Sequence, residues 1–154
     1  MLRYLEFELS HSEAPDETSL CIYISGCPNR CVDCHYPELQ SVDTGAFLLQ
    51  HFEDMLDLYH EYITCVCFLG EGDCSCHSID ELKRHQRTCH ARGYKSCLYS
   101  GRDTEIEDWM IDFDYLKLGS YSSEQGALDI KSTNQRMFKK QPNGDFTNIT
   151  HRFW

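Results

Sequence analysis

The sequence predicts an α/β protein in which strands and helices alternate along the chain. Four segments rich in β-branched and aromatic residues predict strands, at residues 20–25, 63–69, 95–100 and 114–118. Helical periodicity or a capping signal marks each of the three intervals between these segments. This order favours right-handed crossovers and a parallel sheet, in which functional loops follow the carboxyl ends of the strands.

Each interval has its own helix signal. In the first interval, apolar side chains recur at the 3.6-residue period and predict a helix over about residues 44–62. In the second, a capping box at residues 78–81 predicts the start of a helix, and Gly93 fits its end. In the third, a capping box at residues 104–107 predicts a short helix that ends near Ile111.

Length and composition predict a single domain over residues 1–154, and the hydrophobic fraction of 41% is typical of a protein with a core. Residues 26–37 form a cysteine-containing loop rich in turn residues. Residues from about 119 to 154 form a polar C-terminal extension. Within it, the alternating tail at residues 145–154 is expected to add an edge strand.

Charge and hydropathy exclude several classes of function. The chain has 25 acidic and 14 basic residues, a net charge of −11, so we expect neither a nucleic-acid partner nor a membrane surface. No apolar run approaches the roughly 18 residues that span a bilayer, and the first residues do not resemble a signal peptide. We therefore expect a cytoplasmic protein, whose ten cysteines bind metals or do chemistry rather than form disulfides.

The strongest signal is a cysteine triplet, Cys27, Cys31 and Cys34, spaced C-x3-C-x2-C in the loop after the first predicted strand. Three thiolates suit an iron–sulfur cluster in which one iron lacks a protein ligand. That iron can chelate a small molecule that carries an amine and a carboxylate. A zinc site is the alternative, because His35 could supply the fourth ligand that structural zinc requires.

Four segments together resemble a known family. The segment from Gly26 to His35 is similar to the signature loop of radical S-adenosylmethionine enzymes. More narrowly, the chain resembles the activating proteins of anaerobic (class III) ribonucleotide reductase. That family carries a Gly-Gly-Asp-like loop after the second strand, an Asp-Tyr-x-Lys-x-Gly segment and a late Thr-Asn-Gln-Arg. The matching segments here are residues 70–73, 114–119 and 133–136.

The resemblance implies a partial, open (β/α) barrel of the radical S-adenosylmethionine type, with a mostly parallel sheet. The length agrees, since a full eight-fold barrel takes roughly 200 residues or more. Most family members have an Asn-Gly-Pro-Gly-like turn before the first strand, and residues 12–17 stand in its place.

The resemblance also implies a reaction. Cys27, Cys31 and Cys34 would hold a [4Fe-4S] cluster, which receives an electron from a donor such as flavodoxin and cleaves S-adenosylmethionine reductively. The resulting 5′-deoxyadenosyl radical would take a hydrogen atom from a glycine in the C-terminal loop of anaerobic ribonucleoside-triphosphate reductase. Lys117 and Arg136 are expected near the open edge that receives this loop. No side-chain acid or base is required, so no catalytic residue beyond the cluster ligands is predicted.

The other candidate residues are expected to contact S-adenosylmethionine. They are Gly70, Glu71, Gly72 and Asp73 for the methionine moiety, with an acidic side chain and backbone carbonyls toward its ammonium, and Ser100, Gly101 and Gly119 for the adenosine side. Asp33 stands where many family members have an aromatic residue, so His35 or Tyr36 is expected to cover the adenine.

The remaining cysteines favour different interpretations. Core packing is the expectation for Cys21, Cys65, Cys67, Cys89 and Cys97. A second metal site is the alternative for the loop that contains Cys74, Cys76 and His77. Two other functions stay open: another radical S-adenosylmethionine enzyme, either a different glycyl-radical activase or one with a small-molecule substrate, and a non-catalytic zinc-binding interaction module.

Overall fold

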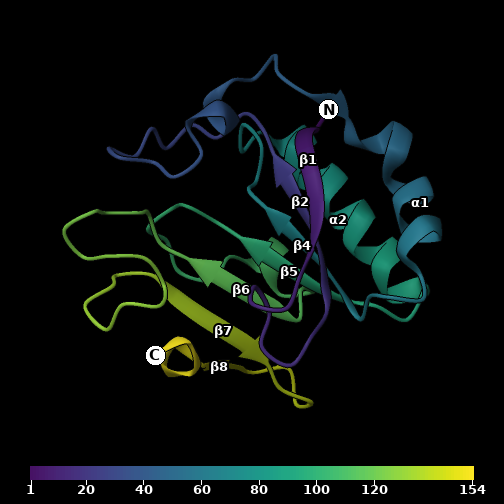
Figure 1. Ribbon diagram of the computed structural model, residues 1–154. Helices are drawn as coiled ribbons and strands as arrows, with labels where there is room; N and C mark the ends of the chain where they lie inside the picture. The colour runs from purple at the N-terminus through teal and green to yellow at the C-terminus, as the bar shows by residue number, and fades with distance from the viewer.

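Eight strands form one open, mixed sheet in the computed structural model, which describes residues 1–154 (Figure 1). The strand order is β3-β1-β2-β4-β5-β6-β7-β8. The strands are β1 (Arg3–Ser10), β2 (Ser19–Ile24), β3 (Ala46–Phe47), β4 (Cys65–Leu69), β5 (Lys95–Tyr99), β6 (Tyr115–Leu118), β7 (Arg136–Lys140) and β8 (Phe146–Asn148). The helices are α1 (Leu48–Tyr59) and α2 (Cys76–Ala91), accompanied by short 3₁₀ helices at Pro37–Gln40, Asp108–Met110 and Thr150–Phe153.

The centre of the sheet is parallel. Strands β2, β4, β5 and β6 lie side by side, and each neighbouring pair is parallel. Strands β1 and β3 extend one side of this centre and β7 and β8 the other, through antiparallel pairs. The predicted α/β class is therefore confirmed, and the sheet is open. With three parallel and four antiparallel pairs, it is mixed, so the expectation of a mostly parallel sheet holds only for its centre.

The antiparallel flanks are where the sequence predictions fall short. Strands β1 and β7 lie in segments for which no element is predicted, although Glu6 and Glu8 of β1 alternate with less polar residues. The predicted edge strand in the tail is confirmed as β8, which pairs with β7 and is followed by a 3₁₀ helix.

Helix starts differ from the predicted ones for local reasons. Helix α1 begins later than predicted, because Ala46 and Phe47 pair with β1 instead. Helix α2 begins at Cys76, since the Ser75 hydroxyl accepts a hydrogen bond from the Ser78 amide and so caps the helix. The predicted capping box at 78–81 is therefore wrong by three residues, whereas the end at Gly93 is confirmed by its positive φ of 82°.

The third predicted helix is wrong. The side chain of Thr104 bonds to the carboxylate of Glu107 at 3.2 Å, rather than to a backbone amide, so the capping box does not form. Only the 3₁₀ turn Asp108–Met110 follows.

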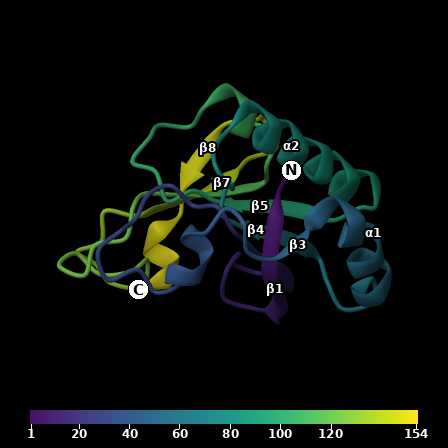
Figure 2. The same cartoon turned by 90° about the horizontal axis from the view of Figure 1, so that it is seen from above.

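Helices α1 and α2 cover one face of the sheet (Figures 1 and 2). Their apolar side chains pack with alternate residues of the parallel strands into the larger core, in which Phe52, Leu56 and Phe68 are almost fully buried. Burial of this apolar surface is the main force that holds the helices on the sheet. No helix is long and apolar enough to cross a membrane.

The opposite face, called the inner face below, is built in rows across the strands. Cys21, Cys67, Cys97 and Tyr115 form one row, since they are register partners on four neighbouring strands. All four are fully buried, and Cys65 packs in the same cluster. Together with the burial of Cys89 in the larger core, this confirms the predicted packing role of these five cysteines.

A second row lies nearer the carboxyl ends of the strands and contains Tyr23, Leu69, Tyr99 and Lys117. The loop between β1 and β2 also crosses the inner face. The Tyr99 hydroxyl donates to the carbonyl of Glu13 at 2.7 Å, and Arg152 near the chain end binds Asp16 through two bonds of 2.6 and 2.8 Å.

Candidate functional site

The loops that follow β2, β4, β5 and β6 meet at one edge of the sheet, which we call the carboxyl edge (Figure 1). A Cβ built on Gly26 would lie 3.4 Å from the backbone of Gly72 and Asp73, so the first two loops touch. The Asn29 amide donates to the carbonyl of Gly101, which joins the first loop to the third. Residues far apart in the sequence therefore share one site.

The fourth loop joins the same site through Gly119. Its backbone amide donates to the carbonyl of Arg102 at 3.0 Å, and its φ of 116° is one that side-chain-bearing residues rarely adopt. The segment 133–136 packs directly against it, since a Cβ on Gly119 would lie 3.0 Å from the Cα of Gln135. The Asn134 amide donates to the Ser120 carbonyl at 3.1 Å.

The cysteine triplet lies in the loop after β2. The backbone amides of Gly26 and Cys27 both donate to the carbonyl of Leu39, which fixes the start of the loop. All three thiols of the triplet are half-buried. Burial raises the pKa of the Cys27 thiol, and the charges of Cys31 and Cys34 raise it further.

The donor set does not converge on a single metal ion. No three His, Cys, Asp or Glu side chains converge closely enough to hold one ion. A four-iron cluster does not require such convergence, because each thiolate binds a different iron. The His35 ring, the fourth ligand of the zinc alternative, packs instead on Tyr121 with 4.2 Å between the ring centroids.

The loop after β4 contains the predicted Gly70–Asp73 segment. Gly70 and Gly72 have φ values of 126° and 65°, so the backbone turns sharply here. Both acidic side chains are engaged within the protein. Asp73 accepts from the Ser78 hydroxyl at 2.7 Å and the Ser75 amide at 3.1 Å, and these bonds lower its pKa to about 2.

Glu71 is a buried carboxylate with a complete set of partners. Arg102 donates to its two oxygens through Nε at 2.9 Å and Nη2 at 3.0 Å. The Ser100 hydroxyl donates to it at 3.0 Å. A second carboxylate, that of Glu107, accepts from Arg102 at 2.6 Å, and these two pairs raise the pKa of the guanidinium. Arg102 therefore ties the loop after β4 to the loop after β5.

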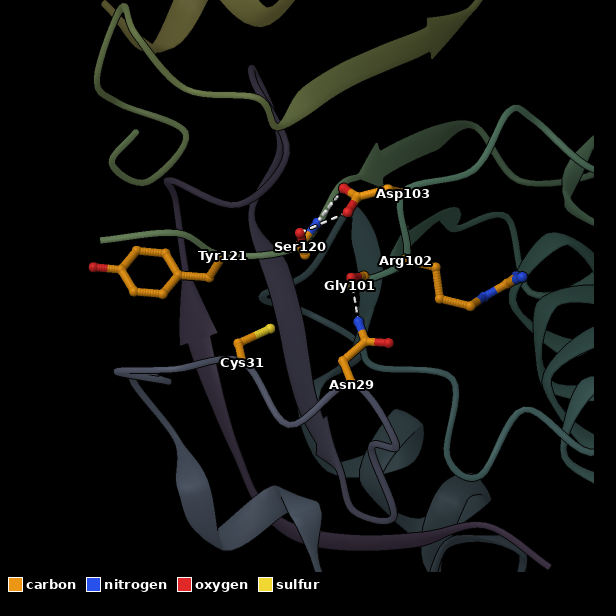
Figure 3. Close-up of a pocket in the computed structure, with 7 residues that line it drawn as sticks. All are labelled: Asn29, Cys31, Gly101, Arg102, Asp103, Ser120 and Tyr121. Atoms are coloured by element: carbon orange, nitrogen blue, oxygen red, sulfur yellow. Dashed lines mark hydrogen bonds between the residues drawn. The ribbon is translucent and has the colours of Figure 1, made fainter. Parts of the chain in front are cut away.

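A pocket of about 470 Å³ opens between these loops (Figure 3). Its lining residues are Asn29, Cys31, Gly101, Arg102, Asp103, Ser120 and Tyr121. Figure 3 shows the Cys31 sulfur directed toward the interior, while the Arg102 side chain points away from it. Ser120 donates to Asp103 through its hydroxyl at 2.8 Å and its amide at 2.9 Å, which lowers the pKa of that carboxyl.

Of the two residues expected to cover adenine, the structure places only His35 near this pocket, through its contact with Tyr121. The Tyr36 side chain turns toward β1 and β2, where its hydroxyl donates to Glu6 and its ring lies 5.0 Å from that of Tyr23.

Lys117 lies on β6 in the second row of the inner face. Burial lowers its pKa to about 8, and the charges of Cys31 and Cys27 act in the opposite direction. Its ammonium lies 5.5 Å from the ring centre of Tyr99 and has no carboxylate partner. The guanidinium of Arg136 donates hydrogen bonds to the carbonyls of Thr133 and Gln135.

The residues of the alternative second metal site differ in their exposure. Cys76 and His77 are exposed on the first turn of α2. Cys74 is half-buried, and its Sγ lies 3.6 Å from the carboxylate of Glu71. Burial raises the pKa of the Cys74 thiol to about 12.

Sequence reasoning missed Asn29, Arg102, Asp103, Ser120 and Tyr121 as lining residues of the pocket. A signal was present, because four of them follow directly after predicted strand ends. Comparison with known families finds none that matches this chain, and comparison with curated proteins finds no similar sequence.

Proposed function

We propose that this chain is a radical S-adenosylmethionine enzyme with a partial, open barrel. We further propose that it generates the glycyl radical of anaerobic ribonucleoside-triphosphate reductase. The observation that carries this proposal is that the four segments of the sequence resemblance meet at one edge of the sheet. They are linked there by contacts of Gly26 with Gly72, of Gly119 with Arg102 and of Gly119 with Gln135.

The loops after β2, β4 and β6 share the carboxyl edge because these strands lie in the parallel centre of the sheet. The convergence supports the proposal because a ligand site is expected at that edge. In open α/β sheets, ligands bind beyond the carboxyl ends of the strands. A cysteine triplet, a glycine-rich turn and a polar pocket at that one edge are the parts that a cluster and a nucleoside cofactor require.

Cys27, Cys31 and Cys34 would hold the [4Fe-4S] cluster. When bound, the cluster supplies the electron for reductive cleavage of S-adenosylmethionine to methionine and a 5′-deoxyadenosyl radical. The protein positions the groups and excludes water. Lys117 contributes a positive charge that offsets the negative charge of the thiolates.

The Gly70–Asp73 loop would bind the methionine moiety mainly through its backbone. Both oxygens of Glu71 accept from Arg102, so this carboxylate is not free for an ammonium group, and Oδ1 of Asp73 accepts from Ser75 and Ser78. Backbone carbonyls of the tight turn are left as acceptors. The pocket beside Cys31 has the size of a small-molecule site, and we assign it to the adenosine moiety.

The partner would reach the site from the carboxyl edge. The β1–β2 loop crosses the inner face, where Tyr99 and Tyr115 donate hydrogen bonds to it. The open sheet leaves a slot rather than a closed pocket. An extended loop that contains glycine fits a slot, because glycine allows close backbone approach. An electron donor such as flavodoxin would complete the system.

Anaerobic reconstitution tests the proposal. We expect about four iron and four sulfide per chain. Cys27→Ala, Cys31→Ala and Cys34→Ala should each abolish the cluster, whereas Cys21→Ala, in the buried row, should retain it. Reduced protein mixed with S-adenosylmethionine and the reductase should give a glycyl-radical doublet in electron paramagnetic resonance. Stoichiometric zinc without sulfide would favour an interaction module, and cofactor cleavage without a partner radical would favour a different radical enzyme.

A further inference from the structure

Leu2 lies directly before β1 and packs against the turn in the Gly70–Asp73 loop. It is only 1% exposed, so its side chain has little room to move. A Cβ built on Gly72 would lie 2.6 Å from Leu2 Cδ2 and 3.2 Å from the Ser78 hydroxyl oxygen. Gly72 therefore has no space for a side chain, because these two residues already occupy it. Leu2 thus forms one wall of the turn.

Leu2 is itself held by a buried carboxylate of α2. Its backbone amide donates to Glu81 Oε2 at 2.9 Å, and Glu81 is 5% exposed. The other carboxylate oxygen, Oε1, accepts no hydrogen bond, and the His85 Nε2 atom lies 3.5 Å from it. A buried carboxylate with so few hydrogen bonds costs stability. Such departures from the ordinary rules of packing are expected where a residue serves a functional site.

Helix α2 holds the loop through two residues of one face. Ser78 and Glu81 are three positions apart, so they lie on the same side of the helix, and both are buried. The Ser78 hydroxyl donates directly to Asp73 Oδ1 at 2.7 Å. Glu81 acts on Gly72 indirectly, through Leu2. Two consecutive residues of the loop are therefore fixed from α2, one by a hydrogen bond and one by a packing contact.

We propose that Leu2 and Glu81 are positioning residues for the site of S-adenosylmethionine. They act through Gly72, by fixing the turn whose backbone carbonyls would bind the methionine moiety. On its other side the same turn contacts the cysteine loop, since a Cβ on Gly26 would lie 3.4 Å from Gly72. A shift of Gly72 would thus change how the turn is placed relative to the triplet. The inference rests on the proposed function and extends the site to residues outside its loops.

The test compares Leu2→Ala with Leu56→Ala, a matched control that truncates the same type of side chain in the same core, on α1. Urea unfolding gives the global stability of each variant. Each protein is reconstituted anaerobically, and binding of S-adenosylmethionine is measured by equilibrium dialysis at equal iron and sulfide content. In the cluster-free proteins, hydrogen exchange measured by mass spectrometry reports local opening of the Gly70–Asp73 loop.

We expect Leu2→Ala to bind S-adenosylmethionine about tenfold more weakly, because a small misplacement of binding groups is costly. Its loop amides should also exchange faster, whereas Leu56→Ala should match the wild type in both measurements. Equal changes in the two variants, or no change in Leu2→Ala, would overturn the inference and leave the proposed function intact. A reconstituted wild type that binds no S-adenosylmethionine would overturn both.

Two further comparisons separate positioning from packing. Glu81→Gln keeps an oxygen that can accept from the Leu2 amide and should retain the affinity, whereas Glu81→Leu should resemble Leu2→Ala. Gly72→Ala should weaken cofactor binding, because the new Cβ meets Leu2. Addition of Leu2→Ala removes that contact and should recover part of the affinity. A Glu81→Gln protein as weak as Glu81→Leu, or losses that simply add in the double variant, would also overturn the inference.

Discussion

Replacement of Arg102 by leucine should destabilise the protein far more than loss of an ordinary surface ion pair. Arg102 makes two hydrogen bonds to Glu71, whose side chain is only 3% exposed. In Arg102→Leu, the Glu71 carboxylate stays buried with the Ser100 hydroxyl as its remaining strong partner. The penalty arises from this uncompensated charge.

The structure sets the expected magnitude. Removal of one partner from a buried pair costs about 3–5 kcal/mol. The Arg102 side chain is 28% exposed and Ser100 remains, so we expect about 3 kcal/mol, the lower end of that range. For a chain of this length, such a loss lowers the melting temperature by about 6–12 °C. Removal of both charges, in Glu71→Gln with Arg102→Leu, should restore most of the loss.

Arg152→Leu is the matched control. Arg152 also binds a carboxylate through two bonds, but its side chain is 40% exposed and that of Asp16 is 58% exposed. Its loss should cost much less than the loss of Arg102, because both members of the pair are exposed to solvent. Urea and thermal unfolding under anaerobic conditions would measure both. Equal losses in the two variants, or no recovery in the double variant, would refute the reasoning.

Three further predictions concern single sites. Gly119→Ala should lower the free energy of unfolding, measured in urea, by about 2 kcal/mol, because its φ is 116° and the new Cβ would lie 3.0 Å from Gln135. Gly93→Ala, with open space around the new Cβ, should lower it by only about 1 kcal/mol. The reverse order of the two losses would contradict this reasoning. Burial lowers the pKa of His85, so its contribution to stability is present above pH 6.5 and lost as the pH falls. His85→Gln should flatten the dependence of the unfolding free energy on pH between 7 and 5, and an unchanged slope would count against it. Burial lowers the pKa of Lys117 to about 8, so its charge opposes folding below pH 8 and the penalty disappears as the pH rises toward 10.5. Cluster-free Lys117→Met should therefore be more stable than the wild type by at most about 3 kcal/mol at pH 7, and a gain that persists at pH 10.5 would rule this explanation out.

The parallel centre of the fold could be predicted because its signals are local. The apolar run before Leu69 and the glycine stop at Gly93 each reflect a backbone or burial requirement of a few neighbouring residues. Strands β1 and β7 could not be predicted in this way. Each is only partly buried, so its sequence has no continuous apolar run.

The same distinction, between local signals and contacts across the fold, applies to the residues of the site. The triplet and the Gly70–Asp73 turn are recognisable because metal binding and a tight turn each require particular residue types at a particular spacing. The role of Glu71 is not, because it depends on Arg102, a residue of another loop. Tyr36 illustrates the same limit, since its direction is decided by Glu6 on β1, a strand that was not predicted. Pairings across the fold cannot be read from local pattern.

The arrangement of parallel centre and antiparallel flanks also bears on the order in which the chain folds. The β1–β2 and β7–β8 pairs join segments that are close in sequence, so they close small loops at low entropic cost. The pairs β2–β4, β4–β5 and β5–β6 each require a longer crossover. Contacts of this kind cost more chain entropy, because they close longer loops. The four loops of the carboxyl edge meet only when those crossovers are complete, so the environment of the triplet depends on the contacts that are most costly to form.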